Sequence, residues 1–201
     1  SLDLAHQVGE PLTGRQFRYT LLPFSFTELA DHSDIPTERQ HLENRLVFGS
    51  YPDIVTQPDD AAELLRGLVG GYLYKDILSL SAIRDPPLLD KLVRALAFQS
   101  GSEVSFTEVG QLIGADGRTV ERYIDLLAKC FVLYVLPAYS NNLRNELKKT
   151  RKVYFYDCGV RNAVIGNFLP IQNRGDVGAL WEAYLIGERL KWRLRNAPDT
   201  R

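Results

Sequence analysis

The chain has 201 residues, of which 45% are hydrophobic and 24% are charged, so a disordered, collagenous or polyelectrolyte chain is excluded. The 24 lysines and arginines nearly balance the 25 aspartates and glutamates, and the net charge is -1. The whole chain therefore has no general attraction for nucleic acid or acidic lipid, and such a role requires a local patch. The length predicts one large domain or two to three small ones.

The cysteines and the hydropathy pattern bear on the cellular compartment. Cys130 and Cys158 lie in apolar or aromatic runs with no second Cys or His at ligand spacing. This excludes a zinc finger module and predicts a reducing, cytoplasmic environment. No apolar run reaches 18 residues and no signal-peptide pattern is present, so we expect no membrane association. Because the chain contains no Met, we expect a fragment of a longer protein.

The N-terminal third contains one clear helix start. Residues 17–22 alternate like a short strand that is broken at Pro23. Ser25, with Glu28 three residues later, is a capping-box pattern that predicts the first turn of a helix. Residues 31–40 are rich in Asp, Ser, Pro and Thr and are expected to form a surface loop.

The middle third is expected to be all helical. Helical spacing of apolar residues predicts helices over residues 37–48, 59–83 and 86–100. The run Gly49-Ser50-Tyr51-Pro52 interrupts the first of these helices, because glycine and proline break helical geometry.

From Gly101 the pattern changes to that of a winged helix-turn-helix. A buried stripe of Val109, Leu112 and Ile113 on the first helix faces a second stripe on the next helix. That second stripe consists of Val120, Tyr123, Ile124, Leu127 and Phe131. The predicted elements are an extended segment 103–105, helices 107–113 and 118–131 around a turn at 114–117, and a hairpin of 132–136 and 153–156. Shorter and longer helices are predicted over 160–165 and 177–195.

The second helix of this unit is the first candidate DNA-reading surface. Its outward face presents Arg118, Thr119 and Arg122, which in a DNA reader contact guanine edges, phosphates or a thymine methyl group. Glu121 and Asp125 on the same helix oppose phosphates, and a winged helix also serves as a packing module. Both interpretations remain open.

The hairpin is the second candidate nucleic-acid-binding surface. Its polar stretch holds five basic residues against the single acidic Glu146, and in a wing they touch the phosphate backbone. The alternative is a solvated loop whose charges protect an edge hairpin from aggregation. The five basic residues are Arg144, Lys148, Lys149, Arg151 and Lys152.

The chain itself carries no catalytic motif. The phosphate-binding pattern Gly-x-x-x-x-Gly-Lys-[Ser/Thr] is absent. His6, His32 and His41 lack partners at metal-ligand spacing, so no metal site is assigned. We therefore expect no catalytic residue and no cofactor in this chain.

Several short runs, in order, resemble prokaryotic ATPases of the AAA+ superfamily that end in a domain of unknown function with nuclease-like features. The resemblance covers nearly the whole chain, although Ser50 replaces a usual Gly and Ala183 a usual Asn. The runs are Leu12-Thr13-Gly14-Arg15, Leu22-Pro23-Phe24-Ser25-Phe26-Thr27-Glu28, Phe48-Gly49-Ser50-Tyr51-Pro52-Asp53, Tyr74-Lys75-Asp76-Ile77, Lys152-Val153-Tyr154-Phe155-Tyr156-Asp157-Cys158-Gly159 and Gly178-Ala179-Leu180-Trp181-Glu182 with Glu188.

The resemblance implies that the phosphate-binding core, with its ATP and magnesium, precedes this chain in a parent protein. Arg15 is then the residue that touches nucleotide, and Glu182 is the helix glutamate of a PD-(D/E)xK-like nuclease region. The implied parts are the end of an ATPase core (1–36), a helical lid region (37–100), a winged helix-turn-helix (101–156) and the start of the C-terminal nuclease-like domain (157–201).

The fold class expected is mainly α with small β, in which a helical lid precedes a winged helix-turn-helix and a partial α/β C-terminal region. The leading functional hypothesis is a non-catalytic fragment of an AAA+-type ATPase, whose winged helix transmits the nucleotide state to a protein partner or DNA. Self-association is a further hypothesis. The alternatives are a winged-helix DNA-binding regulator and a fragment of a PD-(D/E)xK-like nuclease.

Overall fold

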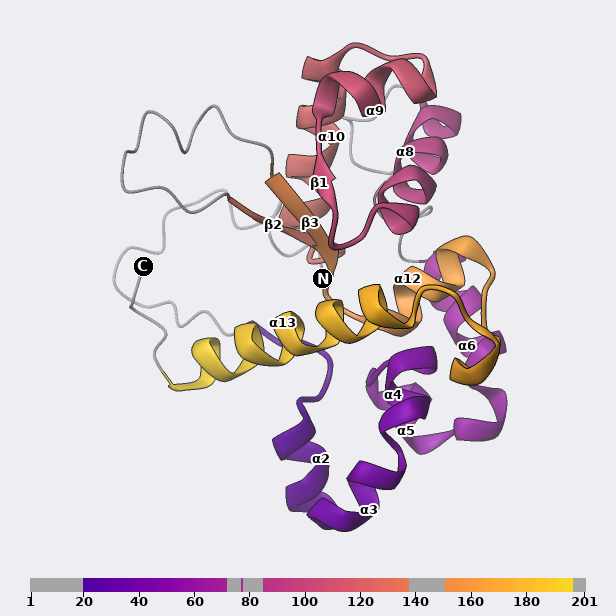
Figure 1. Ribbon diagram of the computed structural model, residues 1–201, viewed down its shortest axis with the longest axis vertical. Helices are drawn as coiled ribbons and strands as arrows, with labels where there is room; N and C mark the ends of the chain where they lie inside the picture. Colours follow the sequence, from indigo (N-terminus) through magenta and orange to yellow (C-terminus); the bar gives the residue numbers. More distant parts are fainter. Residues whose placement is uncertain (1–19, 72–76, 78–84, 138–150, 197–201) are drawn as a thin grey trace, which may run out of the picture.

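The computed structural model describes residues 20–71, 77, 85–137 and 151–196. These residues form a mainly α-helical fold with one small three-stranded antiparallel sheet, as the sequence predicts. The long helix α13 (Val177–Asn196) crosses the middle of the molecule, with the sheet and its helices on one side and the N-terminal helices on the other (Figure 1). Arg15 and the run Tyr74-Lys75-Asp76 lie outside the described residues.

The N-terminal part is a chain of short helices. Ser25 caps the first helix as predicted, because its side chain accepts the Glu28 N–H while the Glu28 carboxylate accepts the Ser25 N–H. Gly49, with φ 74°, ends the third helix at the predicted turn. The helices are α2 (Phe26–His32), α3 (Ile35–Gln40), α4 (Leu42–Phe48), α5 (Pro52–Thr56), the 3-10 turn η1 (Pro58–Asp60) and α6 (Ala61–Leu68).

Two predictions for the N-terminal third are wrong. The described part of the expected strand, residues 20–22, is not in a strand, and the chain just after it pairs with the turn after α4, where the Phe24 N–H donates to the Ser50 carbonyl. The expected loop over 31–40 is mostly the helix α3. Asp34 caps that helix by accepting the Thr37 N–H, and Glu38 is buried in a bidentate pair with Arg45. The polar composition of residues 31–40 predicted a loop, but the buried Glu38–Arg45 ion pair holds α3 in place of an apolar stripe.

The winged helix-turn-helix is present. α8 precedes β1, the helices α9 and α10 form the helix-turn-helix, and β2 and β3 close the sheet in the order β1-β3-β2 with antiparallel pairing. Asp116 caps α10 by accepting the Thr119 N–H at 2.9 Å. The bounds are α8 (Pro86–Phe98), β1 (Glu103–Val104), α9 (Phe106–Ile113), α10 (Gly117–Lys129), β2 (Leu133–Leu136) and β3 (Arg151–Phe155).

The predicted buried stripe of α10 is confirmed from Val120 to Leu127, whose four members are at most 2% exposed. Two other core predictions are wrong. Leu112 is 68% exposed, because one residue of helix rotates it about 100° away from the buried Ile113. Phe131 is 46% exposed, because its backbone turns at φ 57° after α10 and directs the ring toward Tyr156.

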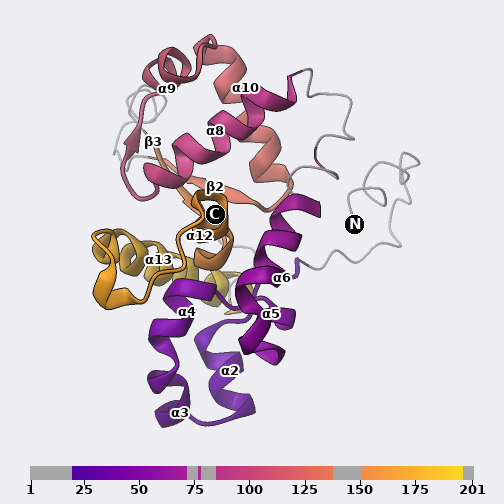
Figure 2. The ribbon, with the colours of Figure 1, turned by 90° about the vertical axis from the view of Figure 1, so that its right-hand side faces the viewer.

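The C-terminal elements join the two ends of the molecule. α12 (Cys158–Ile165) directly follows β3 and packs against α4, α6 and α8, so the winged helix and the N-terminal helices share one core (Figure 2). η3 (Ile171–Asn173) leads to α13, which packs on β3, α4 and α12. Among the residues described here, no helix is both long and apolar enough to cross a membrane.

Candidate functional site

Four of the runs that carry the family resemblance meet at one place, which we call the junction. It lies where the segment before α2, the turn after α4, the start of α12 and the middle of α13 come together. The junction consists of Phe24, Phe26, Gly49, Ser50, Asp157, Gly159, Glu188 and Lys191.

The carboxylate of Asp157 is the centre of the junction. It caps α12 by accepting the Val160 N–H at 3.1 Å, and it accepts the Ser50 N–H at 2.8 Å from 107 residues away in the chain. Burial raises the pKa of Asp157, while the backbone hydrogen bonds and the nearby Lys191 oppose that shift. One side chain therefore fixes both the turn after α4 and the start of α12.

Two glycines make this close approach possible. A Cβ atom on Gly49 would collide with the Asp157 carboxylate, and its φ of 74° also disfavours any other residue. A Cβ atom on Gly159 would collide with the backbone carbonyl of Phe48. The two glycine-containing runs therefore pack directly against each other, since each glycine leaves room for the other segment.

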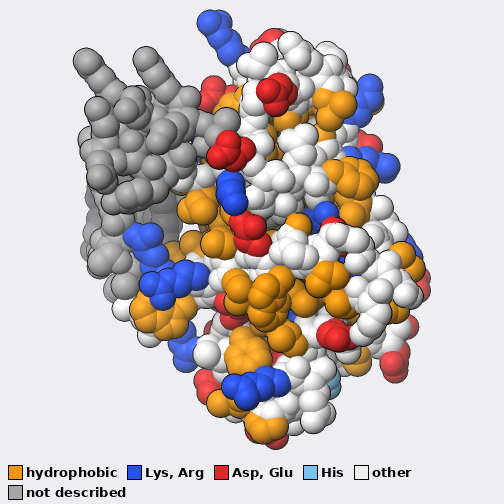
Figure 3. Space-filling view, viewed as in Figure 1, with side chains coloured by type: hydrophobic (Ala, Val, Ile, Leu, Met, Phe, Trp, Pro, Cys, Tyr) orange, Lys and Arg blue, Asp and Glu red, His pale blue; other side chains and the backbone are white. Residues whose placement is uncertain are grey.

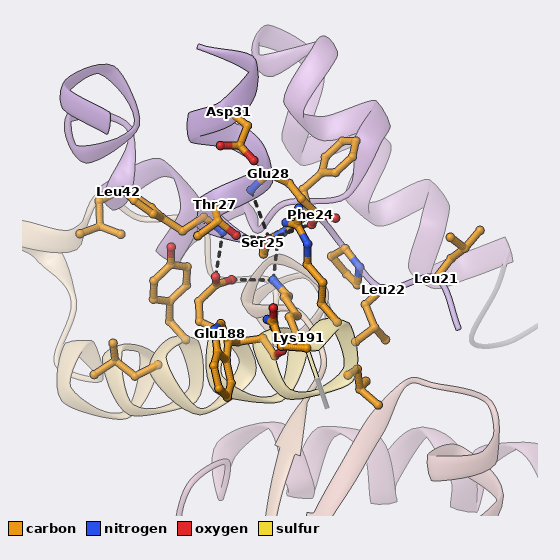
Figure 4. A pocket seen from close by; sticks show the side chains of 18 of the residues that line it. Leu21, Leu22, Phe24, Ser25, Thr27, Glu28, Asp31, Leu42, Glu188 and Lys191 are labelled. Atoms are coloured by element: carbon orange, nitrogen blue, oxygen red, sulfur yellow. Dashed lines mark hydrogen bonds and ion pairs between the residues drawn. The ribbon is translucent and has the colours of Figure 1, made fainter. Parts of the chain in front are cut away.

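α13 supplies the other half of the junction. Glu188 accepts the Phe26 N–H and the Lys191 ammonium, both at 2.8 Å, and Lys191 also donates to the Phe24 carbonyl at 2.8 Å. Ser50 joins this hydrogen-bond network, because its hydroxyl donates to the same Phe24 carbonyl at 2.7 Å. Figure 4 shows Glu188 and Lys191 projecting from α13 toward the segment that holds Phe24 and Ser25.

The polar groups of the junction are therefore engaged with each other, which suits a mechanical connection more than a reaction centre. The segment before α2 is held by α13 and by the Ser50 turn, and Ser50 is held by Asp157. Asp157 follows the end of β3 by two residues. A short chain of hydrogen bonds thus links the segment before α2 to the residue that follows the central strand of the sheet.

The α10 surface presents mixed charge, as expected. Arg118 and Arg122 are exposed and line a shallow hollow of about 350 Å³ together with Lys129, but Glu121 and Asp125 line it too. The guanidinium of Arg122 lies 5.4 Å from the Tyr123 ring centroid. Basic side chains therefore reach this surface without forming a uniformly positive face.

Two of the five hairpin cations are not in the loop where they were expected. β3 begins at Arg151, which pairs with Val104 of β1, so Arg151 and Lys152 are strand residues. Arg151 forms an ion pair of 3.6 Å with Glu121 and lies over the Phe106 ring. Lys152 donates to Glu182 at 2.9 Å. Arg144, Lys148 and Lys149 lie outside the described residues.

Glu182 is part of a polar cluster on the sheet. It accepts the Lys152 ammonium and, at 2.7 Å, the Tyr154 hydroxyl, and these bonds lower the pKa of Glu182. Within the described ranges no group of three His, Cys, Asp or Glu side chains is placed to hold a metal ion. Glu182 is thus engaged as an acceptor by two residues of β3.

Sequence reasoning missed Lys191 and the role of Ser50. Lys191 follows Glu188 by three residues, a spacing that places the two on one helix face and was the available signal. Ser50 was noted only as a departure from the usual Gly, yet its hydroxyl and its N–H both bind junction residues.

Comparison with known proteins gives a family but no activity. The profile of a family described as Domain of unknown function (DUF8612) matches residues 39–170. An uncharacterized protein of Haemophilus influenzae is 23% identical over 173 residues, which make up 81% of this chain and 43% of that protein. Uncharacterized protein MJ1544 of Methanocaldococcus jannaschii is 19% identical over 155 residues, 68% of this chain and 35% of that protein. The chain thus spans less than half the length of these relatives. No solved structure matches it significantly.

Proposed function

The chain belongs to the DUF8612 family, and from that premise we propose that it is the non-catalytic, winged-helix part of an AAA+-type ATPase. In this proposal the chain passes the nucleotide state of an ATPase core to a protein partner or to DNA. ATP and magnesium bind to the core of the parent protein and not to this chain.

The junction is the observation that carries the proposal. The runs that resemble AAA+-type ATPases lie far apart in the sequence, and four of them meet at Asp157, Ser50 and Glu188 through direct hydrogen bonds. The segment before α2 is the one that resembles the end of an ATPase core. Its attachment to α13 and, through Ser50, to the residue that follows β3 gives a core a short physical route to the winged helix.

Two further features support the same proposal. The relatives exceed twice the length of the matched region, which leaves room for a nucleotide-binding core. Arg15 precedes the junction segment, at the position where the resemblance implies a residue that neutralises phosphate charge.

The test uses the parent protein, read from the open frame upstream of Ser1. We expect that frame to encode a Gly-x-x-x-x-Gly-Lys-[Ser/Thr] loop. ATP binding to the parent should then change hydrogen exchange in β3 and α12, and Asp157→Asn should weaken that change while ATP turnover is retained. A matched control is Asp125→Asn on α10, which leaves the junction intact. An upstream frame without the loop contradicts the proposal outright.

Contact of the winged helix with DNA is a second candidate function, favoured by the exposed Arg118 and Arg122 on α10. We propose that such contact runs through the hairpin and is not sequence-specific, since phosphates repel Glu121 and Asp125 on the face of α10 that would have to enter the major groove to read bases. The nuclease alternative has less support, because among the described residues it depends on Glu182 alone.

A further inference from the structure

The two sides of α13 carry side chains of different size. Trp181, Leu185 and Trp192 are exposed on its outer side, and hydrophobic side chains gather along α13 on the face shown in Figure 3. Ala183 and Gly187 are buried on its inner side, next to the end of β3 and the start of α12. Protein interiors have few voids that could hold even a water molecule, so a cavity at this inner contact needs an explanation.

Such a cavity, of about 10 Å³, lies between α12, α13 and the segment that follows α8. Its lining residues, apart from Ala179, are at most 8% exposed, so the surrounding protein shields it from solvent. One buried water molecule requires roughly 10 to 15 Å³. The size of the cavity therefore limits its occupant to a single water molecule or an ion of similar size.

Ser100 places a hydroxyl group at this cavity. Ser100 follows the end of α8 by two residues and is 6% exposed, and its Oγ has no hydrogen-bond partner among the described residues. Burial of a hydroxyl without a hydrogen bond costs free energy, and most buried polar atoms in proteins bond to protein or to ordered water. The Ser100 hydroxyl therefore needs a partner, and the cavity beside it has the volume for one.

Arg161 of α12 supplies the second polar group. It lines the cavity and is 5% exposed. Its Nε donates to the Ala97 carbonyl at 2.7 Å, and its Nη1 donates to Asn162 at 3.1 Å and to Asp176. None of its hydrogen bonds to described residues uses Nη2, which carries two N–H donors. A partner for Nη2 has to be a hydrogen-bond acceptor.

Cys158 lies at the cavity as a third, weaker polar group. Its thiol donates to the Leu180 carbonyl at 3.8 Å, and its sulfur is a weak acceptor. A water molecule can accept from Arg161, bond to Ser100 and donate to this sulfur, which gives it three partners, within the usual two to four. A chloride ion could accept from Arg161 and Ser100, but it is larger than water, and the cavity is at the lower limit for water itself.

We propose that this cavity is a binding site for one structural water molecule, which accepts from Arg161 Nη2 and forms a hydrogen bond with the Ser100 hydroxyl. The water links the segment between α8 and β1, where the winged helix begins, to α12, and α13 covers it. None of the junction residues lines the cavity. The inference therefore does not depend on the proposed function.

A crystal structure of the 201-residue chain, at a resolution that shows ordered water, tests the site directly. We expect one density peak within about 3.2 Å of both Ser100 Oγ and Arg161 Nη2. The proposal would be overturned by the lack of such a peak, for example if the Ser100 hydroxyl has turned onto a backbone carbonyl. An anomalous peak at the same place in crystals soaked in bromide would also overturn it, since the site would then belong to a halide.

Ser100→Ala tests the hydrogen bond in solution, because the two possible states of the hydroxyl predict opposite results. If water bonds to the hydroxyl, its loss should raise the equilibrium constant of unfolding by about twofold to tenfold in urea titrations. An unchanged or lower constant would mean that the hydroxyl has no partner, and would contradict the proposal. Ser102→Ala is the matched control, because Ser102 lies in the same segment and is exposed. Its unfolding constant should equal that of the unchanged protein.

Discussion

Gly159 lies in the first turn of α12, against the backbone carbonyl of Phe48. Gly159→Ala should lower the free energy of unfolding by about 1 to 3 kcal/mol, because the rigid backbone of the α4 turn has to move to admit a methyl group. Gly178→Ala is the control, since a Cβ atom at that position on α13 meets nothing within 4 Å. It should be neutral or stabilising by up to about 1 kcal/mol. Urea unfolding of both variants measures the difference, and equal stabilities would mean that the junction is looser than described.

Asp176 gives the protein a defined response to acid. It accepts hydrogen bonds from the buried Arg161 and Arg174. Burial alone would raise its pKa, but these two guanidiniums outweigh burial and hold the pKa of Asp176 at about 2, below its ordinary value of 3.8. Because the folded-state pKa is lowered, the stabilisation is present above pH 4 and is lost as the pH falls through 2.

The size of this contribution is about 2 kcal/mol, at 1.36 kcal/mol per pKa unit. Asp176→Asn should therefore remove at least about 2 kcal/mol from the free energy of unfolding at pH 7, and should flatten the stability profile between pH 4 and pH 2. Urea titrations over that range measure the profile. Asp125→Asn, an exposed change on α10, should stay within about 0.5 kcal/mol of the unchanged protein.

At the scale of elements, α10 anchors the winged helix through Leu127, which is fully buried. Leu127→Ala should cost about 2 to 5 kcal/mol, as for other core leucines. Leu112→Ala on α9 should cost less than about 0.5 kcal/mol, because that side chain is exposed. Denaturant midpoints compare the two, and a cost below about 1 kcal/mol for Leu127→Ala would contradict the packing of α10.

The ion pairs of β3 reduce the number of hairpin cations that we expect to contact DNA phosphates. Arg151 and Lys152 are paired with Glu121 and Glu182, so three of the five hairpin cations remain to meet phosphates. The logarithmic salt slope on duplex DNA should not exceed about -2.7 from these three, and neutralising Lys148 and Lys149 together should reduce its magnitude by about 1.8. Arg122→Ala should change it less. Anisotropy titrations on several duplexes measure both, and loss of sequence discrimination in Arg122→Ala would identify α10 as a reader.

Elements with a periodic apolar pattern or a clear cap could be predicted from the sequence. Ser25 and its capping box, the helix-turn-helix and α13 are the examples. α3 could not be predicted, because its one buried side chain is Glu38, and Arg45 compensates it from another helix. The junction was missed for a related reason. Its motifs were visible one by one, but hydrogen bonds across 107 and 162 residues leave no local periodicity.

At the scale of the whole molecule, the chain should neither hydrolyse ATP nor bind it tightly. The loop of backbone donors and the lysine that hold phosphates are absent from its sequence. Phosphate release should equal that of a blank without protein, and calorimetry should show no submicromolar affinity. ATP hydrolysis that co-purifies with the protein would contradict this expectation. It would also contradict the proposal that a separate core binds and hydrolyses ATP.

The long sequence separation across the junction also delays its formation while the chain is synthesised on the ribosome. Phe26 and Glu188 are 162 residues apart, so at about 5 to 20 residues per second their hydrogen bond becomes available roughly 8 to 30 s after Phe26 is made. Until then the N-terminal helices lack the α13 surface on which they are held, and their apolar faces stay open to chaperones. We therefore expect the nascent chain to resist proteases late and in one step, and not helix by helix.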